Sequence, residues 1–130
     1  MTTILIVDDE ENTRIGLVKL LCQDGYQTEA VANGFEALDY LGEKKVDLII
    51  TDINMPGMNG LIFLRELNDS YPEIKVVMMT AYSGVGSYLE SMNLGALEYL
   101  SKPVKFEKLK AIISKTFEQT SLLSGSVTVS

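Results

Sequence analysis

The sequence predicts an α/β fold: a doubly wound sheet of five parallel strands, covered by helices on both faces. Short apolar runs of the kind that form buried strands occur along the chain, and segments with helical periodicity fill the gaps between them. The two kinds of segment alternate five times within 130 residues, and such alternation is typical of a parallel sheet with helical crossovers. A chain of this length forms one domain more readily than two.

The central strands are predicted from three runs that consist almost entirely of apolar residues. These runs cover residues 4–7, 48–50 and 76–79. Runs this short and rich in branched side chains indicate strands that are buried on both faces. Two further segments, 27–31 and 97–100, mix polar and apolar residues, which indicates strands at the edges of the sheet.

The helices are predicted from apolar residues spaced three or four positions apart. Four segments carry such a stripe: Ile15, Val18 and Leu21; Phe35, Leu38 and Leu41; Leu61, Leu64 and Leu67; and Phe106, Leu109, Ile112, Ile113 and Phe117. Segment 84–92 is the weakest candidate, because Gly84 and Gly86 disfavour a helix. A weakly held helix is what a switch segment needs, because a small free-energy input can move it.

Placing the apolar strands in the centre and the mixed strands at the edges gives the flavodoxin-like order 2-1-3-4-5. In this order the chain reverses its winding direction between the first and third strands. Ligands bind at the carboxyl ends of the strands that flank such a point, so we expect the site just after Val7 and Thr51. We assign residues 1–120 to this domain. Residues 121–130 lose the periodicity and are expected to form a flexible C-terminal tail.

Composition excludes several classes of function. The chain has no histidine, which argues against zinc sites and rules out Ser-His triads and phosphohistidine chemistry on this chain itself. The net charge of -7 argues against nucleic acid as a direct partner, because phosphate backbones are bound by basic patches. A membrane-spanning helix needs about 20 apolar residues, and every apolar stretch in the sequence is much shorter than that. No signal peptide is visible. We therefore expect a cytoplasmic protein without membrane contact.

Acidic residues gather where the predicted site lies. Asp8 and Asp9 follow the first strand, and Asp52 ends the third. Hard carboxylate oxygens without histidine or cysteine suit Mg²⁺, which also binds phosphate oxygens. An alternative stays open at this point: the acidic residues 8–11 could cap the following helix and favour its dipole.

Two further polar residues lie at carboxyl ends of predicted strands. Thr80 ends the fourth strand, and Lys102 follows the fifth. Either alone would be read as a strand former or a surface lysine. Together with Asp52 they supply a carboxylate nucleophile, a hydroxyl donor and an ammonium, the groups that phosphoryl transfer uses.

These motifs resemble the receiver domain of bacterial response regulators. The resemblance rests on Asp8-Asp9, on the segment DINMPGMNG at 52–60, on Thr80-Ala81 and on the segment YLSKP at 99–103. It extends from about Thr3 to Phe117. Each motif is weak alone, but the ordered set at these spacings is highly specific.

The resemblance implies a role for each site residue. Asp52 would accept a phosphoryl group from a sensor histidine kinase or a histidine phosphotransfer protein. Asp8, Asp9, Asp52 and the backbone carbonyl of Asn54 would hold Mg²⁺. Thr80 and Lys102 would contact the phosphoryl oxygens, and the bond between Lys102 and Pro103 would be cis.

The resemblance also implies a switch that is not an enzyme, although it assists its own phosphorylation and dephosphorylation. Tyr99 would be the switch aromatic, acting together with Thr80. A downstream effector would bind the face made by the fourth helix, fifth strand and fifth helix. A second copy of the chain, in a homodimer that forms on phosphorylation, is a further partner that the resemblance allows. Asn54 and Tyr82 would flank the path of the water that removes the phosphoryl group.

Two rival functions use the same fold or nucleophile. A phosphohydrolase of the haloacid-dehalogenase type needs a second aspartate as general acid-base, but Asn54 stands at that position. A flavin-binding module needs a hydroxyl-rich phosphate loop after the first strand, where this chain has acidic residues that would repel a phosphate.

Overall fold

The computed structural model describes residues 2–81 and 84–129, with side-chain surroundings through residue 117. The strands are β1 (Thr3–Val7), β2 (Gln27–Val31), β3 (Leu48–Asp52), β4 (Lys75–Thr80) and β5 (Glu98–Ser101). The helices are α1 (Glu11–Gln23), α2 (Gly34–Leu41), α3 (Gly60–Ser70), α4 (Val85–Asn93) and α5 (Phe106–Val129). Every predicted strand is present, with bounds that differ from the prediction by at most two residues.

The strands form one parallel sheet in the order β2-β1-β3-β4-β5, which confirms the predicted doubly wound topology. The register pairs Val7 with Thr51 and Asp52 with Met79. The carboxyl ends of β1, β3 and β4 are therefore nearly level. Residues that follow these strands meet at one edge of the sheet.

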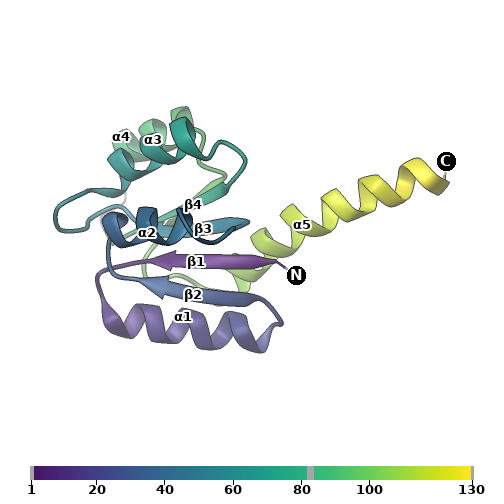
Figure 1. Cartoon of the computed structure of the whole chain (residues 1–130), viewed down its shortest axis with the longest axis horizontal. Coiled ribbons are helices and arrows are strands. Elements are labelled where there is room, and N and C mark those ends of the chain that lie inside the picture. Colours follow the sequence, from purple (N-terminus) through teal and green to yellow (C-terminus); the bar gives the residue numbers. More distant parts are fainter. Residues whose placement is uncertain (1, 82–83, 130) are drawn as a thin grey trace.

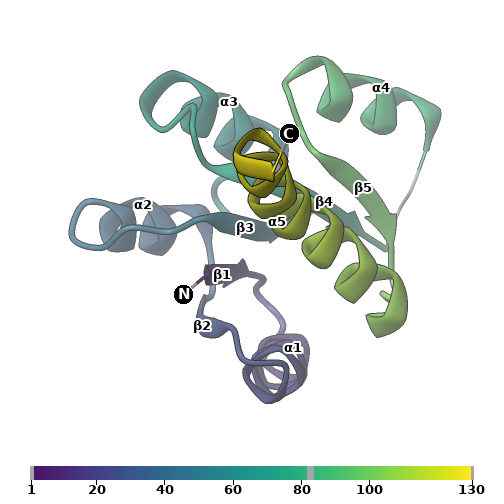
Figure 2. The same ribbon diagram turned by 90° about the vertical axis from the view of Figure 1, so that its right-hand side faces the viewer.

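Helices cover both faces of the sheet (Figures 1 and 2). Strand residues alternate between the faces: Ile4 and Ile6 pack with apolar side chains of α1 and α5, whereas Leu5 and Val7 pack with those of α2 and α3. The three central strands are buried on both sides, as their continuous apolar sequences predicted.

The predicted helix faces are correct for α3 and α5 and shifted for α1 and α2. Leu64 and Leu109 are fully buried, but Ile15 is 57% exposed and Phe35 is 55% exposed. In α1 and α2 the predicted Leu21 and Leu41 do cover the sheet, together with Leu17 and Ala37, which the prediction did not include. Apolar residues three apart share a helix face, but their spacing does not show which of two adjacent faces packs on the sheet. Ala37 was not included because the prediction used only large apolar residues.

Helix α5 continues to Val129, past residue 120, where the sequence predicted a tail. Figure 1 shows its last turns reaching beyond the sheet. The apolar stripe seen in the sequence ends at Phe117, but a backbone does not need such a stripe to remain helical. The flexibility of residues 121–130 stays a prediction. Among the described residues, no helix combines the length and apolar character that a membrane span requires.

Candidate functional site

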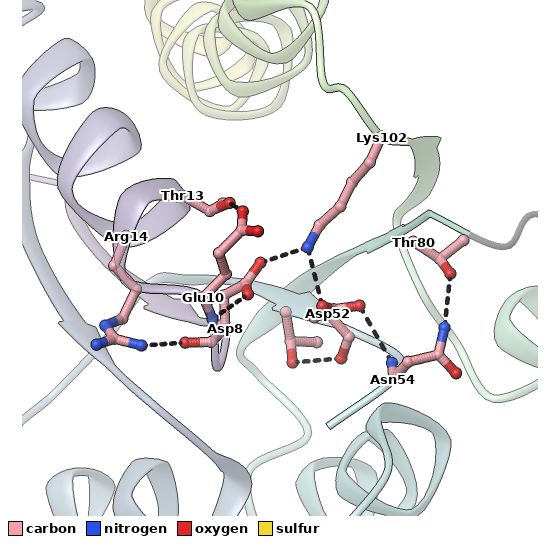
Figure 3. Close-up of polar contacts among 9 residues, drawn as sticks. Asp8, Glu10, Thr13, Arg14, Asp52, Asn54, Thr80 and Lys102 are labelled. Carbon is pink, nitrogen blue, oxygen red and sulfur yellow. Dashed lines mark hydrogen bonds and ion pairs between the residues drawn. The ribbon is translucent and has the colours of Figure 1, made fainter. Parts of the chain in front are cut away.

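The site lies at the carboxyl ends of four strands (Figure 3). Asp8 follows β1, Asp52 ends β3, Thr80 ends β4, and Lys102 follows β5. Asp8 and Thr80 are fully buried, and Asp52 is 5% exposed. The backbone N–H of Lys102 donates to the carbonyl of Thr80 at 2.7 Å, which fixes the start of the Lys102 side chain beside β4. The topology thus brings together residues that are up to 94 positions apart.

Asp52 is held by the tight connection from β3 to α3. The N–H of Gly60 donates to the carbonyl of Ile53 at 2.7 Å, and a Cβ at position 60 would lie 2.3 Å from the backbone oxygen of Asp52. Only glycine allows the helix to start this close to the strand end. Gly57 has a φ of 85°, a left-handed conformation that also favours glycine in this turn.

Asp8 belongs to the site more than to the cap of α1. Its Oδ1 accepts a hydrogen bond from the N–H of Glu10 at 2.8 Å, and its carbonyl accepts one from the Arg14 guanidinium at 2.7 Å. Glu10 occupies the N-cap position but makes no side-chain cap bond. Its carboxylate instead accepts a hydrogen bond from the Thr13 hydroxyl. The capping alternative therefore does not explain the buried Asp8 carboxylate, whose Oδ2 faces Lys102 (Figure 3).

Lys102 bridges the two buried aspartates. Its Nζ lies 2.7 Å from Asp8 Oδ2 and 2.9 Å from Asp52 Oδ2. Partial burial lowers the pKa of the Lys102 ammonium, but hydrogen bonds and attraction from Asp8 and Asp52 outweigh this effect, and the pKa is raised above its ordinary value. The lysine is therefore positively charged at neutral pH and offsets part of the negative charge of the cluster.

The donor set suits a hard divalent cation. Asp8, Asp9 and Asp52 each offer a carboxylate oxygen, and these oxygens all lie within 4.8 Å of one another. Asp9 is exposed, so the cluster is open to solvent on one side. Oxygen ligands of this kind fit Mg²⁺. The N–H of Asn54 donates to Asp52 Oδ1 at 3.1 Å, while a role for its carbonyl stays a prediction.

Asn54 also contacts the end of β4. Its side-chain amide donates to the Thr80 hydroxyl at 3.1 Å. Sequence reasoning assigned Asn54 and Thr80 separate roles and missed this contact. The position of Asn54, two residues beyond Asp52, was the only signal that could have suggested it. The role of Arg14, which binds the Asp8 carbonyl, was missed because one surface arginine on a helix carries no such signal.

Tyr99 lies apart from the carboxylates. It is on β5, is partly buried, and its hydroxyl contacts Ser87 of α4 at 2.6 Å. Tyr82, expected near the path of the hydrolytic water, lies outside the described residues. The bond between Lys102 and Pro103 is cis, as the resemblance implied.

Comparisons with known proteins agree with this geometry. The response regulator receiver domain family matches residues 4–114. Over 112 residues the chain is 38% identical to sporulation initiation phosphotransferase F of Bacillus subtilis, covering 86% of this chain and 90% of that protein. Over 125 residues it is 40% identical to the transcriptional regulatory protein ZraR of Klebsiella oxytoca. That alignment covers 96% of this chain but spans only 28% of the length of ZraR.

Solved structures share the fold. The response regulator protein TrrA of Thermotoga maritima, in complex with Mg²⁺-BeF, is 39% identical, with a TM-score of 0.80 over 88% of this chain and 98% of that chain. A response regulator receiver domain protein of Clostridium thermocellum is 30% identical, with a TM-score of 0.86 over 95% of this chain and 99% of that chain.

Proposed function

This chain belongs to the response regulator receiver domain family, and on that premise we propose that it is a phosphorylation-operated switch with Asp52 as the phosphoacceptor. One observation supports this assignment above the others. Asp52 is a nearly buried carboxylate whose Oδ2 contacts the Lys102 ammonium and whose Oδ1 accepts the N–H of Asn54. Two more aspartates lie close enough to share a cation with it.

The donor would be the phosphohistidine of a sensor kinase or a phosphotransfer protein. An oxygen of Asp52 attacks the phosphorus, the bond from phosphorus to the donor's imidazole nitrogen breaks, and that nitrogen keeps the electron pair. This chain has no histidine and depends on its partner for the donor. The similarity to the Bacillus subtilis protein, which is named a phosphotransferase, supports a place in a relay of this kind.

Asp8, Asp9 and Asp52 would hold Mg²⁺, joined by the carbonyl of Asn54. When bound, the ion supplies positive charge beside the oxygens of the transferred group. The Lys102 ammonium neutralises a further part of the negative charge on the transferred phosphoryl group, since it already lies at the oxygens of Asp8 and Asp52. It keeps its contact with Asp8 while it pairs with the new phosphoryl oxygen.

Thr80 and Tyr99 would carry the change to the surface. The Thr80 hydroxyl exchanges its contact with Asn54 for a phosphoryl oxygen, and Tyr99 turns inward behind it. The effector would bind α4, β5 and α5, where apolar side chains such as Val85 and Leu89 are exposed. The protein is then a switch that assists its own phosphorylation, with no separate substrate.

Titration with beryllofluoride tests this proposal, because this anion mimics a phosphoryl group on an aspartate. We expect Mg²⁺-dependent shifts in the NMR spectrum that begin at Asp52 and reach α4 and β5. Asp52→Asn should abolish them, and Asp69→Asn, at an exposed aspartate of α3, should leave them intact. Shifts that persist in Asp52→Asn, or that survive chelation of Mg²⁺, would contradict the proposal.

A further inference from the structure

Helix α4 is packed in an unusual way. Its one fully buried residue is Ser91, whereas Val85 is 76% exposed and Leu89 is 54% exposed. Helices of this kind usually turn their apolar face to the core and their polar residues to solvent. The hydrophobic effect therefore contributes little to the docking of α4 in the position observed beside β5 (Figure 2).

Other features weaken the docking of α4 further. The hydroxyl of Ser91 is buried and has no hydrogen-bond partner among the described residues, which is unfavourable for a polar group removed from water. The N-cap residue is Gly84, which provides no side-chain cap. Because packing and capping contribute little to the stability of the docked α4, a polar contact from α4 to its neighbours contributes a larger share of it.

One such contact joins Ser87 of α4 to Tyr99 of β5. Their hydroxyl oxygens lie 2.6 Å apart. The Ser87 hydroxyl also lies 3.3 Å from the carbonyl of Gly84, to which it can donate while it accepts the hydrogen of the Tyr99 hydroxyl in the short bond. The ring of Tyr88 meets that of Tyr99 edge to face, with centroids 5.6 Å apart and an angle of 86° between planes.

We propose that Ser87 is a positioning residue that holds Tyr99 in its resting orientation and thereby ties the start of α4 to β5. Tyr99 cannot turn inward and keep this hydrogen bond, so the bond favours the resting state. Its part in signalling rests on the proposed function, but the tie itself is a property of the unmodified protein. Loss of the bond would loosen α4 and make the inward orientation of Tyr99 more accessible.

Amide hydrogen exchange of the unphosphorylated protein tests the tie. Ser87→Ala should lower the protection of the α4 amides of residues 88–93 about fivefold, the effect of one lost hydrogen bond. Alanine favours a helix more than serine does, so helix propensity would change protection in the opposite direction. Tyr99→Phe should have the same effect, and the double variant should lose no more than either single variant.

Two further variants serve as controls. Ser87→Thr keeps a hydroxyl and should retain most of the protection. Ser91→Ala removes a buried hydroxyl that has no hydrogen-bond partner among the described residues. It makes the same chemical change as Ser87→Ala but should raise the protection of the same amides. Unchanged protection in Ser87→Ala, or additive losses in the double variant, would overturn the proposal.

Beryllofluoride with Mg²⁺ then tests the link to the switch. Ser87→Ala should bind it about fivefold more tightly than the wild type, because less free energy holds the resting state. Equal or weaker binding in Ser87→Ala would overturn the switching role of Ser87. Failure of the wild type to bind would overturn the proposed function instead, and the exchange results would still decide whether Ser87 ties α4 to β5.

Discussion

The side-chain amide of Asn54 donates a hydrogen bond to the hydroxyl of Thr80 across 3.1 Å, joining the ends of β3 and β4. The backbone N–H of the same residue donates to Oδ1 of Asp52. Asn54 therefore contacts both the proposed phosphoacceptor and the hydroxyl proposed to meet the phosphoryl group. The sequence led us to expect that Asn54 holds Mg²⁺ through its carbonyl and flanks the path of the hydrolytic water, and its side chain also contacts Thr80 before phosphorylation.

Asn54→Ala should therefore ease the movement of Thr80. We expect Mg²⁺-dependent beryllofluoride binding to tighten about fivefold, since one hydrogen bond of the resting state is lost. Calorimetric titration measures this directly. Asn12→Ala, at an exposed asparagine of α1, is the control and should bind as the wild type does. Weaker binding in Asn54→Ala would show that the Asn54 side chain helps more than it restrains.

Lys102→Ala should separate metal binding from phosphorylation. The ammonium lies between Asp8 and Asp52, so its loss removes a positive charge that competes with a cation and leaves the two carboxylates without the charge that pairs with them. We expect the metal-free variant to melt at a lower temperature than the wild type, and Mg²⁺ to raise its Tm by more. Phosphorylation by acetyl phosphate should fall at least about tenfold, because the charge that stabilises the transferred group is gone.

The control is Lys105→Ala, at an exposed lysine in the loop before α5. It should change neither the Mg²⁺ response nor the rate of phosphorylation. A Lys102→Ala variant that binds Mg²⁺ more weakly than the wild type would contradict the place given to the ammonium.

Gly60→Ala should destabilise the connection that holds Asp52. The added Cβ would lie 2.3 Å from the backbone oxygen of Asp52 and 2.7 Å from Cα of Ile53, so the start of α3 must move. We expect a loss of about 2–3 kcal/mol in the free energy of unfolding. Gly16→Ala is the matched control, since nothing lies within 4 Å of its Cβ position in α1.

Gly16→Ala should raise the stability by about 0.5–1 kcal/mol, because alanine suits a helix interior better than glycine. Urea unfolding of both variants measures the two changes. Similar stabilities for the two variants would show that the β3–α3 connection adapts without strain.

Tyr82→Ala and Tyr82→Glu should both lose the phosphoryl group faster than the wild type. The prediction rests on the resemblance to the family, which implies that Tyr82, two residues beyond Thr80, and Asn54 flank the path of the water that attacks the phosphorus. A bulky ring at position 82 should obstruct that water, and Asn54 has no carboxylate to act as a base. Decay of the phosphorylated protein at fixed Mg²⁺ is the measurement, and unchanged or slower decay in both variants would refute the obstruction.

The sequence sufficed to predict the sheet and the meeting of the site residues. The apolar runs identify the central strands, and once their order is known, parallel strands bring Asp8, Asp52, Thr80 and Lys102 to one edge. The helix faces were harder, because Ile15 and Leu17 differ by two positions and either could have met the sheet. The bonds from Asn54 to Thr80 and from Ser87 to Tyr99 depend on side-chain orientation, which no spacing encodes.

In the proposed function, Asp52 accepts a phosphoryl group with the help of a divalent cation. The most direct measurement is the intact mass of the protein after incubation with acetyl phosphate, with Mg²⁺ and with Mg²⁺ chelated. We predict the gain of one phosphoryl group in the wild type with Mg²⁺, and no gain in Asp52→Asn or after chelation. A phosphoryl group that still appears in Asp52→Asn, or that forms equally well without Mg²⁺, would contradict this role of Asp52 and of the cation.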